Sequence, residues 1–502
     1  MYNWAFFAPY LKNDACSKHR QRSRKLNRRS KRRKGSRRPN TPARRTSGPT
    51  GSARLGNAPP EEGTSQGEIR ACLERLQRWL RPEPLESRAR ETRFLRRKPK
   101  KITPLLFVQA ALLLVTQSVV SLSRWAVLLG ILSHGRVSKQ SVWERLTQSA
   151  VDFLQQMLGL VLAERITQGC AAVPEALRAF GRVLVQDSTV IKLIAKLAKL
   201  FPGSRNQRGA KHGQLKIQAL YDLLTQRFLC FSLSGFNRND QAAARDVLPL
   251  LRKGDLVLRD LGYFVMETFH HIALAGAFFL SRLRLDTGLF DPTTGRAINL
   301  LRLLRRYGQL DLPVLLGQQK LPARLVAIRL PEPLAAERRR KAKQNRDKRC
   351  QPNARYLALL GWAIFVTNVD RRVLRARAVA QVYGLRWRIE TIFKAWKSHF
   401  RITAVPKGSP AQLLAVIYAR LIFLTVMIPF CTASWQEAWR SHPLPPRSLL
   451  KTAALLGDFF LLLCLEAWQI QVTDALAQQL DYHGRYERRA RQNFVEKLMK
   501  LT

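Results

Sequence analysis

Two short apolar segments, each ending on an aspartate, constrain the fold of this chain more than any other feature. Residues 182–187 and 256–260 are rich in valine and leucine, and their last residues are Asp187 and Asp260. Such runs are typical of buried strands, and neighbouring strand ends bring their side chains together at one rim of a sheet. An aspartate after a strand is more often a turn or cap residue, so these two acids alone give modest support for a shared site.

The neighbouring segments extend this pattern into a sheet. Residues 215–221 and 227–234 both alternate between apolar and polar side chains, which predicts two strands joined as a hairpin. Residues 238–252 predict a helix, and residues 278–282 predict a further strand. This order of strands and helices predicts an α/β fold with a mixed sheet.

The segments on either side are predicted to differ in character. Residues 103–180 read as helices, and residues 286–370 add strand-like segments and a basic loop at 338–349. The strand-like segments of the second region are 312–316, 323–330 and 356–369. From residue 376 onward the chain is predicted to be helical.

A short helix beginning near Ser138 resembles the reading helix of a helix-turn-helix. Ser138 is a good N-cap, and Ser141 and Arg145 lie one and two turns further along the same face. Many ordinary helix pairs share this pattern, so DNA contact and plain packing both remain open.

The net charge implies a polyanionic partner. The chain carries 87 Lys and Arg against 34 Asp and Glu, a formal charge of +53. Residues 1–45 hold 16 basic residues and one acid, which leaves 71 basic and 33 acidic residues, or +38, for the rest. Attraction to phosphate should therefore be strong and sensitive to salt, although part of the excess can be a solvated surface.

Residues 1–66 cannot bury enough apolar surface to fold alone, and we expect them to be disordered. They can be a DNA-gripping arm or an upstream translation extension with no role. Residues 67–100 predict a basic helix and linker. The seven cysteines form no CxxC pair and no signal peptide is visible, which favours a reducing cytosol.

Two long apolar stretches, residues 105–132 and 413–430, are interrupted by polar side chains. A clean run of about 20 apolar residues is what a bilayer demands. We therefore predict buried helices in both stretches and no membrane span.

Five polar residues share one stripe of a helix predicted near residues 383–397. They recur at steps of three or four along the chain: Tyr383, Arg386, Glu390, Lys394 and Lys397. The apolar residues of this segment fall on other faces, as expected if the helix packs on a core. A solvated charged face explains the stripe, and so does a metal-binding carboxylate flanked by phosphate-binding cations.

This run, Y-x2-R-x3-E-x6-K, resembles the Tyr-Arg-Glu-Lys signature of bacterial cut-and-paste insertion-sequence DDE transposases. Residues 185–189 (VQDST) and 258–264 (LRDLGYF) resemble the blocks that carry the first two acids of that family. Residues 279–282 and 365–368 resemble further blocks. The similarity covers about residues 105–435.

The resemblance implies a ribonuclease H-like mixed-sheet catalytic core with a β-rich insertion, preceded and followed by helical regions. The expected domains are a basic, largely disordered region (1–100), a helical DNA-binding region (101–180), the first part of the core (181–285), the β-rich insertion (286–370), the second part of the core with the signature helix (371–435) and a helical C-terminal region (436–502).

The resemblance also implies the site. Asp187, Asp260 and Glu390 would hold two Mg²⁺ or Mn²⁺ ions that activate the attacking oxygen and neutralise the leaving one. Trp362 would stabilise a flipped base, although a buried strand tryptophan explains it equally. The remaining DNA-binding residues would be Tyr383, Arg386, Lys394, Lys397, Arg282 and Arg284.

The function implied is metal-dependent excision and strand transfer of an insertion sequence by a DNA transposase. Its partners would be double-stranded DNA, the terminal inverted repeats and target DNA, bound as a homodimer without a membrane. The expected location is the bacterial cytoplasm, associated with the nucleoid. A catalytically inactive DNA-binding derivative, a nuclease of the same fold and a basic coat protein are the alternatives, and the last leaves the signature unexplained.

Overall fold

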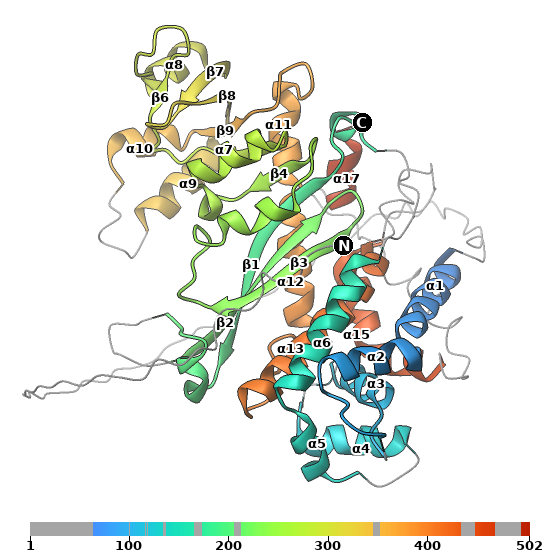
Figure 1. Ribbon diagram of the computed structural model, residues 1–502. Coiled ribbons are helices and arrows are strands. Elements are labelled where there is room, and N and C mark those ends of the chain that lie inside the picture. Colours follow the sequence, from blue (N-terminus) through green and yellow to red (C-terminus); the bar gives the residue numbers. More distant parts are fainter. Residues whose placement is uncertain are drawn as a thin grey trace, which may run out of the picture. The chain divides into compact units, whose positions relative to one another are not determined.

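The computed structural model describes most of the chain after residue 63 (Figure 1). The described residues are 64–99, 101–115, 117, 119–133, 137–164, 173–204, 212–344, 352–432, 447–466 and 493–501. Residues Glu61–Thr502 group into one compact unit. The disorder predicted for the first 63 residues lies outside the described residues, and the division of the compact unit into domains stays a prediction.

A mixed sheet forms the centre of this unit, as predicted. Its strands are β1 (Val183–Leu193), β2 (Gly213–Asp222), β3 (Arg227–Gly235), β4 (Leu256–Arg259), β5 (Phe278–Arg282), β6 (Leu289–Phe290), β7 (Leu310–Leu316), β8 (Leu321–Arg329) and β9 (Trp362–Thr367). The order in the nine-stranded sheet is β3-β2-β1-β4-β5-β9-β8-β7-β6. The β1–β4 and β4–β5 pairs are parallel, and the other pairs are antiparallel, including the predicted hairpin of β2 and β3.

The segment predicted as a β-rich insertion extends this same sheet, because β9 joins β5 to β8. Two details of the prediction are wrong. Residues 356–359, expected in a strand, belong to helix α10 (Ala354–Leu359), whose N-cap Asn353 accepts a hydrogen bond from the Tyr356 backbone. The basic run from residue 338, expected as a loop, lies in α9 (Glu332–Lys343) as far as residue 343, and the described part of the loop ends at residue 344.

The prediction of an α-helix over residues 238–252 is also wrong, since only a 3₁₀ helix, η3 (Ala244–Leu250), forms there. Pro249 has no backbone N–H to continue an α-helix and its ring crowds the preceding turn. Upstream, Asn239 accepts a hydrogen bond from the Ala242 backbone and holds that segment as a turn.

Helices precede the sheet, as predicted. They are α1 (Thr64–Trp79), α2 (Pro82–Glu91), α3 (Pro104–Leu114), α4 (Leu122–Leu132), α5 (Lys139–Arg145) and α6 (Gln148–Ala163). Ser138 caps α5 by accepting a hydrogen bond from the Ser141 backbone, which confirms the predicted start of that helix. The turn between α4 and α5 includes residues 134–136, which lie outside the described residues.

Helices also follow the sheet: α11 (Ala376–Gly384), α12 (Trp387–Ser398), α13 (Pro410–Thr432), α15 (Leu449–Glu466) and α17 (Phe494–Met499). By length and composition, Pro410–Cys431 of α13 is the one described segment that could cross a membrane, and 89% of its most apolar window is buried inside the structure. Arg420 in this helix is fully buried and donates hydrogen bonds to the backbone oxygens of Val115 and Ile402. The prediction of a buried helix is therefore confirmed for this stretch.

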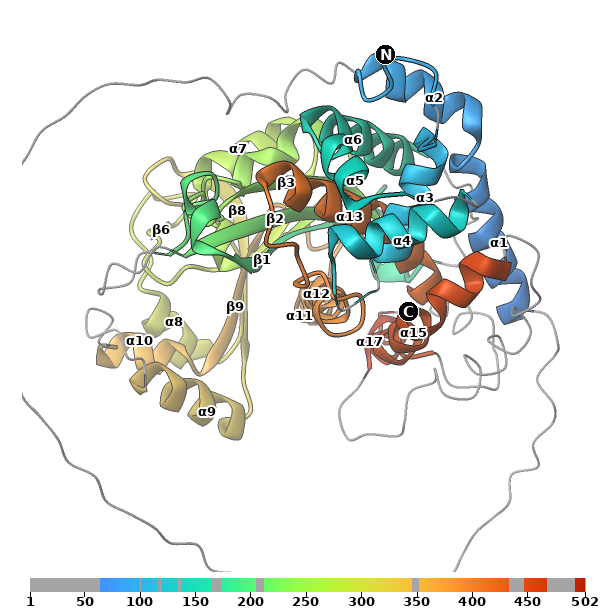
Figure 2. The ribbon, with the colours of Figure 1, turned by 90° about the horizontal axis from the view of Figure 1, so that it is seen from below.

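Two separate cores cover the two faces of the sheet. Side chains alternate along a strand, so Val183 and Val185 join the core that includes α12 and α13, whereas Leu184 joins the core that includes α7 (Met266–Leu274). Figure 2 shows α11 and α12 together, away from α7. The face of the sheet that α12 covers therefore determines which side chains can meet Glu390.

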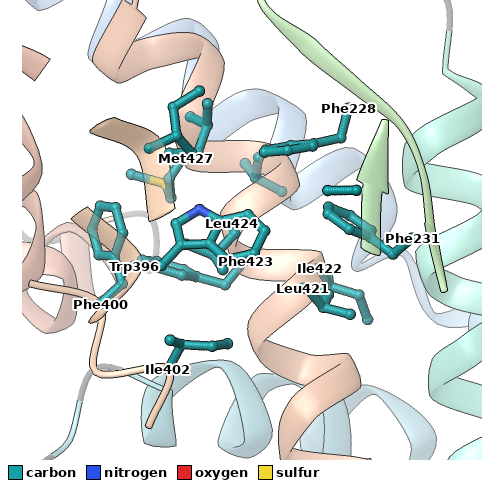
Figure 3. Packing of buried hydrophobic residues seen from close by; sticks show 14 of the residues in the cluster. Phe228, Phe231, Trp396, Phe400, Ile402, Leu421, Ile422, Phe423, Leu424 and Met427 are labelled. Carbon is teal, nitrogen blue, oxygen red and sulfur yellow. The ribbon is translucent and has the colours of Figure 1, made fainter. Parts of the chain in front are cut away.

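Trp396 anchors α12 in the first core. Its indole is fully buried, and its ring centre lies 5.3 Å from that of Phe228 and 5.9 Å from that of Phe231 on β3 (Figure 3). Phe423 and Met427 of α13 lie on its other side. This packing fixes the α12 helix against the sheet, two turns beyond Glu390.

Candidate active site

The two aspartates occupy adjacent strands of the sheet. In the parallel pair β1–β4, Val185 lies opposite Leu258, and this is where the pairing ends. Asp187 and Asp260 each follow two residues later. Asp260 comes directly after β4, as predicted, but the prediction that β1 ends at Asp187 is wrong. The strand continues to Leu193 because its other edge stays paired with β2.

Alternation along these strands decides where the carboxylates point. Val185 and Leu258 both belong to the core that includes α12, and Asp187 and Asp260 lie two residues further on. Both carboxylates therefore face the side of the sheet on which α12 lies, and Glu390 comes from that helix.

The segment predicted as one continuous helix is divided in two. Residues Leu385 and Arg386 connect α11 to α12, and the Arg386 backbone donates to the oxygen of Tyr383, three residues back, rather than four. The tightened turn keeps the helical direction, so Arg386 and Glu390 remain neighbours one turn apart.

Arg386 joins all three acids. Its Nη1 lies 3.3 Å from Asp187 Oδ2, and its Nη2 lies 2.7 Å from Glu390 Oε1 and 3.7 Å from Asp260 Oδ1. The Arg386 side chain is 7% exposed, whereas the side chains of Asp260 and Glu390 are 42% and 38% exposed. Side chains from β1, from the end of β4 and from α12 thus converge on a single buried cation.

Burial shapes the electrostatics of this cluster. Burial raises the pKa of Asp187 to about 6, and the nearby Glu390 and Asp260 act in the same direction. The Ser188 backbone N–H and Arg386 oppose that rise. Burial lowers the pKa of Arg386, but Tyr383 and the three acids outweigh it, so this pKa is raised above its ordinary value and the side chain stays charged.

The donor set suits a hard divalent cation. All three ligand candidates are carboxylates, the groups that Mg²⁺ and Mn²⁺ prefer in proteins. Among the described residues, no three His, Cys, Asp or Glu side chains stand close enough to hold a metal as they are placed. The guanidinium of Arg386 already supplies positive charge at their meeting point, so a metal ion and Arg386 would have to share the three carboxylates.

Two other predicted residues lie near this cluster. The Tyr383 ring is 5.2 Å from that of Phe365, and the Arg386 guanidinium lies 5.9 Å from its centre. The charge of Arg282, at the end of β5, acts on Tyr383 and lowers its pKa, although burial still raises that pKa to about 12. The structure therefore places Tyr383 beside Arg386 and within the electrostatic influence of Arg282 and Asp260.

The remaining predicted DNA-binding residues have no contact with the three acids among the described interactions. Lys394 and Lys397 are exposed on α12, one and two turns beyond Glu390. Arg284 pairs with Asp286 at 2.8 Å. Trp362 begins β9, and its indole N–H donates to the Gly308 backbone oxygen at 2.8 Å, so the structure ties this ring to the insertion.

Two residues that sequence reasoning missed stand beside the site. Trp387 is 57% exposed, and the Arg386 guanidinium lies 5.7 Å from its ring. Asp240 accepts a hydrogen bond from the Ser188 hydroxyl, next to Asp187. Trp387 follows directly on the signature arginine and could have been singled out, but nothing in the sequence marks Asp240.

Comparisons with known proteins point to one family. The family described as Transposase DDE domain matches residues 178–426. The transposase for insertion sequence element IS231B of Bacillus thuringiensis is 30% identical over 386 residues, which cover 72% of this chain and 80% of the relative. The transposase for insertion sequence element IS1151 of Clostridium perfringens is 26% identical and covers 60% and 68%.

A solved structure, the piggyBac transposase synaptic complex with hairpin DNA, matches with a TM-score of 0.39 at 9% identity, over 85% of this chain and 87% of that one. That likeness is too low to bear on the fold. The sequence relatives carry the assignment: this chain belongs to the DDE transposases of bacterial insertion sequences.

Proposed function

We propose that this transposase excises and transfers its element with Asp187, Asp260 and Glu390 as the ligands of two Mg²⁺ or Mn²⁺ ions. The observation that carries the proposal is the convergence of these three carboxylates, from three elements, on the single guanidinium of Arg386. Two such ions, when bound, supply an activated oxygen nucleophile and neutralise charge on the leaving oxygen.

The protein side chains would position the phosphate. Arg386 can give two N–H groups to two oxygens of one phosphate, a contact that a lysine cannot reproduce. Tyr383 lies beside Arg386, and the charge of Arg282 acts on Tyr383. Lys394 and Lys397 extend the positive charge along α12. Together these groups would hold the scissile phosphate in line with the attacking oxygen.

We also propose that the catalytic core is ribonuclease H-like, with residues 286–370 as its insertion. Support comes from the run of three antiparallel strands, β3-β2-β1, followed by the parallel strands β4 and β5. The acids lie on β1 and directly after β4, and the third comes from a helix packed on the sheet.

The proposed partners follow from the chemistry and the charge. The enzyme would bind the terminal inverted repeats of its element and then target DNA, as a homodimer that holds two ends together. Its surroundings would be the bacterial cytoplasm and nucleoid. The excess of positive charge outside the first 45 residues supports binding to a long polyanion.

A helix-turn-helix role for α5 makes a testable prediction. Lys139 is exposed in the first turn of α5. If it contacts a phosphate, Lys139→Ala should weaken binding to the end of the element and reduce the slope of log affinity against log salt by about one. Glu144→Gln, which removes a negative charge from the same helix, should instead strengthen binding to the end of the element. Filter binding at several salt concentrations measures both, and an unchanged slope in Lys139→Ala would remove α5 from the interface.

Base stacking makes a second prediction. We propose that Trp362 stacks on a flipped base, and the exposed ring of Trp387 is the other candidate. Stacking of a base on an aromatic ring is worth about 1–3 kcal/mol, so Trp362→Ala should slow cleavage about tenfold. It should also change the fluorescence of 2-aminopurine placed at the end of the element. If Trp387→Ala alone has these effects, the role belongs to Trp387.

The overall function is tested with the purified full-length chain and a duplex that carries the element's end. The expected products are cut ends in the presence of Mg²⁺ or Mn²⁺ and joined products when a plasmid target is added. Binding without metal-dependent cutting would indicate an inactive DNA-binding derivative. Cutting without joining would indicate a nuclease of the same fold.

A further inference from the structure

The backbone pairing of β1 and β4 stops just before the two aspartates. Its last pair is Val185 and Leu258, so the β1–β4 ladder does not reach the positions that carry the acids. A side-chain hydrogen bond spans the strands at the next position instead. Arg259 Nη2 donates to Gln186 Oε1 at 3.0 Å. These two residues immediately precede Asp260 and Asp187.

Arg259 is an unusual residue for this place. Its side chain is fully buried, and burial lowers its pKa to about 10. Among the described residues no carboxylate forms an ion pair with it, although the charge of Asp246 partly opposes the lowering of its pKa, and its Nε and Nη1 have no hydrogen-bond partner. Its remaining contacts are the Ala244 backbone oxygen, 2.8 Å from Nη2, and the ring of Tyr263, 5.6 Å from its guanidinium carbon.

Such a residue is a poor choice for stability alone. Removing a cation from water without an opposite charge beside it is unfavourable, and apolar side chains of similar volume commonly stabilise such positions better. The neighbouring strand positions, Leu184 and Val257, carry the apolar residues that such a site favours. The presence of Arg259 is therefore better explained by what it holds in place.

Residues 240–244, which include the Ala244 that Arg259 contacts, bond to β1 on both sides of Asp187. Gln186 Nε2 donates to the Ala243 backbone oxygen at 2.7 Å, on the near side. On the far side the Ser188 hydroxyl donates to Asp240 Oδ1 at 3.0 Å. Asp240 is itself held by Lys216, whose Nζ lies 2.7 Å from the same oxygen. Asp187 thus lies between two tethers to residues 240–244, and Arg259 ties that loop to β4.

We propose that Arg259 is a positioning residue that sets the spacing of Asp187 and Asp260 and thereby the affinity of the site for a divalent cation. Its hydrogen bonds to Gln186 and Ala244 join β1, β4 and the loop at the position before each acid. The inference rests on the proposed role of the three carboxylates. It goes beyond that role by naming a buried residue, on the opposite face of the sheet, on which the ligand geometry depends.

The test measures metal binding rather than turnover. Mn²⁺ is titrated into the full-length chain bound to a duplex of the element's end, and free Mn²⁺ is followed by electron paramagnetic resonance. Loss of groups that orient metal ligands typically weakens binding about 10- to 100-fold, and we expect Arg259→Met to raise the half-saturating Mn²⁺ concentration at least about tenfold. Binding of the DNA itself should be unchanged.

Arg420 offers a matched control. It is also a fully buried arginine, but it lies in α13 and donates its hydrogen bonds to the backbone oxygens of Val115 and Ile402. Arg420→Met should alter thermal unfolding and leave the Mn²⁺ titration as in the wild type. Gln186→Leu removes the hydrogen bond between Gln186 and Arg259 but keeps Arg259, and it should also raise the half-saturating Mn²⁺ concentration. This variant replaces Arg259→Met in the test if Arg259→Met does not fold.

The outcomes separate this inference from the proposed function. A wild-type titration in Gln186→Leu, or an equal shift in Arg420→Met, would overturn the role of Arg259. Asp187→Asn should lose Mn²⁺ binding. If Asp187→Asn instead binds Mn²⁺ as the wild type does, the assignment of the carboxylates themselves fails, whatever Arg259→Met shows.

Discussion

Asp187→Asn, Asp260→Asn and Glu390→Gln are each expected to reduce the rate of cleavage of the element's end at least about a thousandfold. Catalytic groups that act as a unit lose rate on this scale when one of them is removed. Each substitution keeps the size of the side chain and removes one anionic oxygen ligand. The structure gathers the three carboxylates around Arg386, so each substitution removes a ligand from the same cluster. Plasmid excision and cleavage of a labelled duplex measure the loss.

Binding to the end should persist in these variants, since neutralising an acid does not weaken attraction to phosphate. A gel-shift assay with the same duplex checks this point. Glu332→Gln is a suitable control, because this acid is 73% exposed in α9 and lies outside the cluster. Excision that survives in any one of the three variants would remove that residue from the triad.

Arg386→Ala is expected to weaken end binding or cleavage by about 1–3 kcal/mol, the scale of a lost charge-assisted contact. In rate or affinity this is on the order of 10- to 100-fold. The arginine is almost fully buried beside the acids, so its guanidinium is already ordered before a phosphate arrives. Single-turnover cleavage and end-binding titrations show which of the two steps is affected.

Two variants sharpen this prediction. Arg386→Lys keeps the charge but loses the two-pronged donor geometry, so it should rescue only part of the loss. Arg377→Ala removes an exposed arginine from the adjacent helix α11 and should leave cleavage unchanged. Equal losses in Arg377→Ala and Arg386→Ala would mean that general positive charge, rather than the position of Arg386, is what matters.

The sequence predicted the parts of the site that local pattern controls. The recurrence of Tyr383, Arg386 and Glu390 at steps of three and four predicted that they would lie together, and the contacts of Arg386 confirm that placement. The apolar face of α12 likewise predicted that Trp396 would be buried, and it is. Both inferences depend only on helical geometry, which tertiary contacts rarely alter.

Features that depend on pairing between distant segments could not be read in the same way. The end of β1 was placed at Asp187 because its run of valine and leucine stops there, yet pairing with β2 carries the strand six residues further. The sequence indicated a β-rich insertion at residues 286–370 but not how its strands pair, and β9 joins it to the central sheet.

Buried polar residues were the hardest to recognise. Arg259 looks like an ordinary surface charge in the sequence, although it is fully buried, and nothing local indicates that the half-buried Asp240 bonds to β1. Their roles come from hydrogen bonds to Gln186 and Ser188, which are more than 50 residues away along the chain.

The most direct test of the account is to locate Mn²⁺ by anomalous scattering in a crystal of the full-length enzyme with its end duplex. We expect two Mn²⁺ positions between Asp187, Asp260 and Glu390, with Arg386 turned from the carboxylates toward the scissile phosphate. Manganese bound elsewhere, with the three carboxylates still gathered on Arg386 in a complex that cuts DNA, would contradict it.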